Sequence, residues 1–196
     1  MVVPRTFRNE NERILASYDY TDIVEGTGTI YYMGFTTINN TTTSWKLTSE
    51  SIRSQNAAYA FSGDAGTFEK VFDLSVFNLP HTVQGSSIIT GNYNFVLGFA
   101  GRTSYLTIYI MKWDGVTETS LGSARTATLS ANSGETDFTF AVDLTRTNFS
   151  QGDTLRVKLE VVTTGDAGTN STWTIKLDPT DATTGLRVGI PYSIDL

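Results

Sequence analysis

The alternation of apolar and polar residues at every second position constrains this chain more than any other feature. It is clearest over residues 154–162, where four aliphatic side chains alternate with charged ones; the aliphatic set is Leu155, Val157, Leu159 and Val161. A period of two predicts a β-strand with one buried and one solvent-facing side. Similar runs recur from Thr29 onward, and no segment of helical length carries a period of 3.6 residues.

The spacing of these runs predicts about eight to ten strands separated by turns. The expected strands are 29–36, 44–48, 69–77, 87–99, 105–113, 118–129, 136–144, 154–162, 172–177 and 188–196. Asp114-Gly115 predicts a hairpin turn, residues 49–67 an irregular segment, and residues 78–86 a loop. Pro191 favours an edge position for the last strand, because proline cannot donate to a ladder. The predicted fold is an all-β, two-sheet antiparallel sandwich of jelly-roll or Greek-key type.

The composition agrees with this fold and excludes several functions. Charged residues make up 17% of the chain, and about 32 threonines take their place. There is no cysteine and one histidine, which excludes disulfides, zinc-thiolate sites and thiol nucleophiles. The formal net charge of −6 argues against nucleic-acid binding. We expect no membrane partner either, because the longest apolar-leaning run, 105–113, is too short to span a bilayer.

Residues 1–28 differ from the rest, because they lack sustained alternation. We interpret them as an extended N-terminal arm that precedes a single sandwich domain over residues 29–196. The residues proposed to dock this arm on a neighbouring subunit are Arg5, Phe7, Arg8 and Arg13. A plain leading strand and a disordered tail are the alternatives. The start of the sequence does not have the apolar region of a signal peptide.

One stretch carries a resemblance to known proteins. Phe138–Asp143 is followed by a short loop with Phe149, and Gly152-Asp153 then opens the next strand as far as Glu160. The stretch is similar to jelly-roll domains of galactose-binding type and to structural proteins of tailed bacteriophages. Physically, we expect the aromatic ring to plug one end of the sandwich and Asp153 to bond backbone amides at the strand start.

Few residues are candidates for a binding site. Trp45, Trp113 and Trp173 could stack on a sugar or contact a partner, although most tryptophans in a sandwich lie in the core. The loops at 63–66 and 178–181 could hold a structural Ca²⁺ ion, with plain turns as the alternative. We predict no other cofactor or metal.

Catalysis finds little support in the residues. His81 follows a proline and is expected to be an exposed loop residue, without the partners that a general base needs. The carboxylates fall mostly at turns, where they serve turn geometry. We therefore predict that the chain is not an enzyme.

These observations lead to two hypotheses for function. The first is a structural protein of a virion, such as a head decoration or auxiliary capsid protein or a neck or tail component, that forms a homo-oligomer and contacts other virion proteins. Its motivation is the threonine-rich, weakly charged composition and the arm. The second is a carbohydrate-binding or adhesin module at an extracellular surface, which binds a surface glycan.

Overall fold

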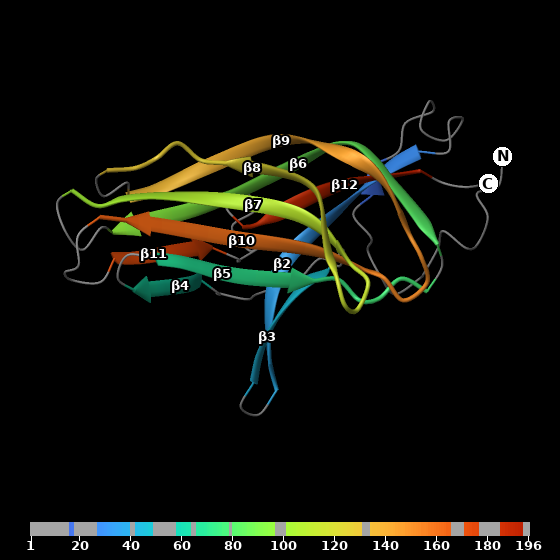
Figure 1. Ribbon diagram of the computed structural model, residues 1–196, viewed down its shortest axis with the longest axis horizontal. Helices are drawn as coiled ribbons and strands as arrows, with labels where there is room; N and C mark the ends of the chain where they lie inside the picture. Colours follow the sequence, from blue (N-terminus) through green and yellow to red (C-terminus); the bar gives the residue numbers. More distant parts are fainter. Residues whose placement is uncertain are drawn as a thin grey trace.

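The structure, a computed structural model, describes residues 16–17, 27–39, 42–48, 58–63, 66–78, 80–96, 101–130, 134–165, 171–176 and 185–193. All regular secondary structure in these ranges is β-strand, as the alternation predicts (Figure 1). The strands are β1 (Ala16–Ser17), β2 (Thr27–Asn39), β3 (Thr42–Thr48), β4 (Ala58–Gly63), β5 (Gly66–Asp73), β6 (His81–Val96), β7 (Thr103–Trp113), β8 (Glu118–Arg125), β9 (Gly134–Phe149), β10 (Thr154–Thr164), β11 (Ser171–Lys176) and β12 (Arg187–Ser193).

Eight of these strands form the two sheets of a jelly roll. One sheet has the order β2-β12-β6-β9 and the other the order β5-β10-β7-β8. Numbered among themselves along the chain, the eight strands read 1-8-3-6 and 2-7-4-5, so every connection except the β7–β8 hairpin passes from one sheet to the other. All of these pairs are antiparallel, and the predicted jelly-roll sandwich is confirmed.

The remaining strands extend this framework. β11 pairs with the last residues of β6 and carries β4 on its other side. β3 forms a hairpin with β2 that projects from the body of the sandwich (Figure 1). β1 adds two residues beside β2. The proposed arm residues Arg5, Phe7, Arg8 and Arg13 lie outside the described residues, so the role of the arm stays a prediction.

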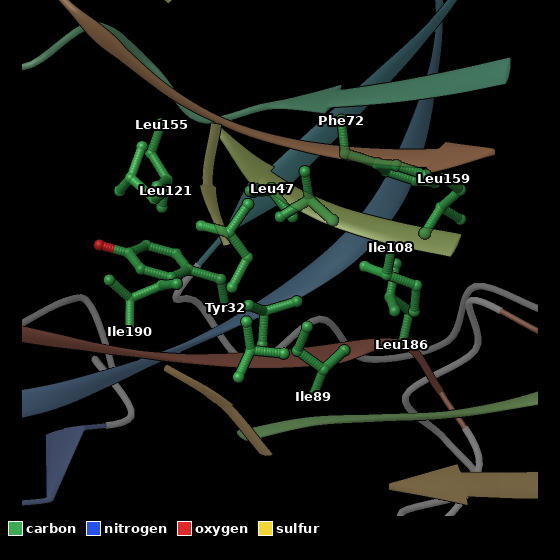
Figure 2. Close-up of a cluster of buried hydrophobic side chains, with 14 of the residues drawn as sticks. Tyr32, Leu47, Phe72, Ile89, Ile108, Leu121, Leu155, Leu159, Leu186 and Ile190 are labelled. Atoms are coloured by element: carbon green, nitrogen blue, oxygen red, sulfur yellow. The ribbon is translucent and has the colours of Figure 1, made fainter. Parts of the chain in front are cut away.

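The core fills the space between the two sheets. Figure 2 shows side chains from both of them meeting there, including Ile89 and Ile190 from one sheet and Phe72, Ile108 and Leu159 from the other. All five are fully buried. They occupy the apolar positions of the alternation, which is why the opposite positions on the same strands face outward.

An aromatic cluster closes one end of the sandwich. The ring of Phe149 packs edge-on against Phe77 at 5.1 Å between ring centroids, and Phe149 is 1% exposed. A carboxylate oxygen of Asp153 accepts a hydrogen bond from the Ser150 amide at 2.6 Å, and Lys112 forms a 2.7 Å ion pair with it. The roles predicted for Phe149 and Asp153 are therefore confirmed.

Three local predictions need correction. β4 lies within the segment expected to be irregular, and β6 begins at His81, so residues 81–86 are strand and not loop. β12 is central and not an edge strand, although it contains Pro191. Its register against β6 shifts between Gly189 and Tyr192, and Gly85 stands beside the proline ring with a φ of 101°. Because of the bulge, Pro191 has no ladder partner on β6, so its missing N–H costs no hydrogen bond there.

Candidate interaction surfaces

The first candidate surface is the outer side of β5, β10, β7 and β8, which we call the ladder face. Its centre is Arg156, whose Nε and Nη2 donate to the two carboxylate oxygens of Asp73 at 2.7 and 3.0 Å. Nη1 donates to Glu118 at 2.5 Å, and the guanidinium lies 4.6 Å from the centre of the Trp113 ring. Hydrogen bonding to Asp73 raises the pKa of Arg156 above the ordinary arginine value. One side chain thus joins all four strands of this sheet.

The same arrangement repeats along β7. Lys158 lies 5.0 Å from the Tyr109 ring centre and forms a 3.3 Å ion pair with Glu69. The Tyr109 hydroxyl donates to Glu160 at 3.1 Å, and burial, followed by this hydrogen bond, raises the pKa of Tyr109. Aromatic rings and cations on neighbouring strands are stabilising cross-strand pairs. The ladder face therefore satisfies its own charges.

The three predicted tryptophans fall in three different environments. Trp113 lies on the ladder face, and the guanidinium of Arg156 covers one side of its ring. Trp173 is 3% exposed and stacks in the core against Tyr93 at 6.1 Å, so its ring does not reach the surface of the chain. Trp45 pairs with Thr36 in the β2–β3 hairpin, and its side chain lies outside the described part of the structure. The structure does not bring these residues together.

The other predicted residues have structural roles where they are described. His81 is half-buried, with its ring 5.0 Å from Phe77, and is not the exposed loop residue that we expected. Asp114 accepts hydrogen bonds from the amides of Val116 and Thr117, and these bonds hold the pKa of Asp114 below its usual value. The described residues contain no group of three or more metal-ligating side chains. The Ca²⁺ candidates are untested, because residues 178–181, 64 and 65 lie outside the described ranges.

The second candidate surface is the β2–β3 hairpin. Its register runs from the pair Met33–Thr48 to the pair Asn39–Thr42. Within the described ranges, a parallel bridge between Lys46 and Asp73 is the hairpin's one ladder contact with the opposite sheet. Figure 1 shows the far end of the hairpin clear of the sandwich. The sequence predicted two strands here but gave no sign that they project.

The third candidate surface is the outer side of β2, β12, β6 and β9, which we call the polar face. Asn92 and Asn94 lie here, because the residues between and beside them, Tyr93 and Phe95, point into the core. Arg187 of β12 lies opposite Thr90. The sequence analysis missed these residues, although the alternation of asparagine and aromatic residues over 92–95 places the amides on the outward side.

The fold and these surfaces define a jelly-roll β-sandwich, and comparison with known proteins adds likeness of fold alone. No protein-family model matches the sequence, and no curated protein matches it either. An aminopeptidase from the marine sediment archaeon Thaumarchaeota archaeon has 10% identity and a TM-score of 0.56 over 83% of this chain and 36% of its own. An α-amino acid ester hydrolase has 10% identity and a TM-score of 0.53, over 76% of this chain and 34% of its own. The chain therefore spans about a third of these proteins.

A viral structure is a more distant neighbour. The VP2 subviral particle of infectious bursal disease virus has 14% identity and a TM-score of 0.31, over 83% of this chain and 43% of its own. Separately, no helix among the described residues is long and apolar enough to cross a membrane.

The comparisons correct one prediction. We expected from the residues alone that the chain is not an enzyme, but the two structures with the higher TM-scores are an aminopeptidase and an ester hydrolase. The fold therefore occurs within hydrolases and does not separate this chain from enzymes. The prediction was wrong because the lack of a recognisable catalytic motif in a sequence does not exclude an enzyme.

Proposed function

We propose that this chain is a structural subunit of a viral particle that assembles with copies of itself through the β2–β3 hairpin. The observation that carries the proposal is the projection of this hairpin from the sandwich (Figure 1). The threonine-rich composition and the 17% charged content are consistent with it. In such a particle the chain would serve as a head decoration, neck or tail component.

The hairpin is suited to docking for a physical reason. A two-stranded β-ribbon is marginally stable by itself, and each of its outer edges presents unpaired backbone N–H and C=O groups. A neighbouring subunit that covers the ribbon or pairs with an edge would satisfy these groups and bury apolar residues. The sequence of the ribbon includes Phe35, Ile38 and Trp45, which is the kind of composition that interface centres favour. Trp45 would act here as an interface residue.

The experiment is to measure the native mass of the full chain and of a variant with a shortened hairpin. Residues 36–45 are replaced by Asn-Gly, which closes a two-residue turn on the existing pair Phe35–Lys46. We expect the full chain to form a symmetric oligomer and the shortened variant to be a monomer with an unchanged melting temperature.

A matched control changes another exposed hairpin. Val116→Thr alters the turn between β7 and β8, where Val116 is 84% exposed, and should leave the oligomer intact. A monomeric full chain, or a shortened variant that keeps the full oligomeric mass, would show that the hairpin is not the assembly element. Removal of residues 1–28 tests the arm in the same way.

A further inference from the structure

The polar face contains three buried polar atoms that have no hydrogen-bond partner among the residues that the structure describes. They are Oδ1 of Asn92, Oδ1 of Asn94 and Nε of Arg187. Asn92 is 5% exposed although its side chain lies on the outward side of β6. Buried groups of this kind are nearly always paired, and an unpaired one is costly. We propose that this part of the polar face binds a neutral carbohydrate.

The topology brings the three side chains together. Asn92 and Asn94 are two residues apart on one strand and therefore share a side of the sheet. Arg187 lies opposite Thr90, so it is a diagonal neighbour of Asn92, at roughly 7–8 Å between Cα atoms. β6 pairs with β12 as far as Thr90 and with β11 from Tyr93 onward. Asn92 thus faces the place where one neighbouring strand replaces the other.

The orientation of the Asn92 amide is fixed by its other contact. Its Nδ2 donates to Oδ1 of Asp137 at 2.9 Å, and a carboxylate only accepts hydrogen bonds. Oδ1 of Asn92 therefore points away from Asp137 and requires a donor from the ligand. Arg187 Nε is a donor and requires an acceptor. A ligand for this site must therefore offer both a hydrogen-bond donor and an acceptor.

A sugar hydroxyl meets this requirement, because it donates one hydrogen bond and accepts others. A sulfate dianion would serve Arg187 but has no donor for the two asparagine oxygens, and a hydrogen phosphate dianion has one O–H for two oxygens. Either anion would stand near Asp137. An ammonium group would serve the oxygens and be repelled by Arg187. Neighbouring hydroxyls on one pyranose ring can satisfy the three atoms together.

Tyr31 adds a flat surface beside these polar groups. Its ring lies against Gly189, where an added Cβ would be 2.9 Å from the ring atom Cε1. Gly189 is two residues from Arg187, so the ring and the guanidinium share the outward side of this sheet. A half-exposed aromatic ring can pack against the C–H face of a sugar. The proposed ligand is therefore an oligosaccharide of pyranose rings, with the hydroxyls of one ring at Arg187 and the asparagines and another ring against Tyr31.

The test begins with the full chain on an array of neutral oligosaccharides. Calorimetry with the methyl glycosides of glucose, galactose and mannose then measures affinity. We expect at least one neutral sugar to bind, and Arg187→Gln and Asn94→Ala each to weaken it by about tenfold or more. Because the proposal concerns atoms without protein partners, both variants should keep the melting temperature of the original chain.

Lys158→Met is the matched control, since it removes a cation from the ladder face and should leave sugar binding unchanged. Three outcomes overturn the proposal. The first is that no neutral sugar binds, which leaves water as the occupant of these atoms. The second is that inorganic phosphate, sulfate or a peptide binds at Arg187 in preference to a sugar. The third is that Arg187→Gln binds the sugar as well as the original chain does.

Discussion

The two outer faces of the sandwich use their polar residues in opposite ways. On the ladder face Arg156 has two carboxylate partners and an aromatic ring, and Lys158 has Glu69 and Tyr109. On the polar face Asn92 and Arg187 each keep a buried atom without a partner among the described residues. The same alternation thus produces a self-satisfied surface on one sheet and unused hydrogen-bonding capacity on the other. A ligand gains most from the second kind, because the protein has already desolvated those groups.

Strand order explains the difference. β10 lies between β5 and β7 over nearly its whole length, so every outward residue on it has neighbours on both sides. β6 exchanges β12 for β11 near Asn92, and the row of outward side chains is interrupted there. Interruptions of a sheet commonly coincide with functional positions. The comparison therefore concerns topology as much as residue type.

The largest effect is expected from one substitution made on each face. Arg156→Gln removes a bidentate ion pair, a second carboxylate contact and a contact with the Trp113 ring, and should lower the free energy of unfolding by about 1–3 kcal/mol. Arg187→Gln removes a donor without a partner and should change it by less than about 0.5 kcal/mol. Urea unfolding of both variants measures the two values. Equal losses would show that the faces do not differ in the way described.

A second prediction examines the inner side of the sheet that carries the polar face. Burial, and then the neighbouring Tyr32, raise the pKa of Tyr192 well above its ordinary value, and the two hydroxyls are 3.0 Å apart. The folded chain therefore holds this proton where the unfolded chain releases it, and stability is present below about pH 10 and falls above it.

The expected slope is about 1.4 kcal/mol per pH unit for one proton. Tyr192→Phe should remove this part of the stability loss at alkaline pH. Unfolding curves collected between about pH 9 and pH 11 measure it. Tyr109→Phe is the comparison on the ladder face, because Tyr109 also has a raised pKa but is less buried than Tyr192. If Tyr192→Phe left the pH dependence of the free energy of unfolding unchanged, the buried Tyr32–Tyr192 pair would not be its cause.

Much of the fold could be predicted from the sequence, because it depends on local signals. The alternation over 154–162 and the Asp114-Gly115 turn both correspond to observed elements, and Phe149 and Asp153 do what the local pattern indicates. Each of these predictions needs only neighbouring residues. The buried side of a strand follows from its own residues, once a strand is assumed.

The errors required information about distant residues. Pro191 indicates an edge strand unless one knows that β6 bulges at Gly85 beside it. Trp173 resembles a surface residue after a polar turn, but Tyr93 and Phe95 enclose it from another strand. Arg102 is fully buried and donates to Ser171, 69 positions away, a contact that no local pattern indicates. The unpaired groups of the polar face were missed for the same reason, because they come from β6 and β12, which are distant in the sequence.

The smallest predicted effect distinguishes the rungs within the ladder face. Arg156 makes a bidentate contact with Asp73 at a side-chain exposure of 14%, whereas Lys158 makes a single 3.3 Å contact with Glu69, whose side chain is 48% exposed. A single pair open to water is screened, so Lys158→Met should cost at most about 0.5 kcal/mol, and added salt should reduce this cost further. Urea unfolding at low and high ionic strength provides the measurement. A loss as large as that for Arg156→Gln would mean that contact with the Tyr109 ring, rather than hydrogen-bond geometry, stabilises this face.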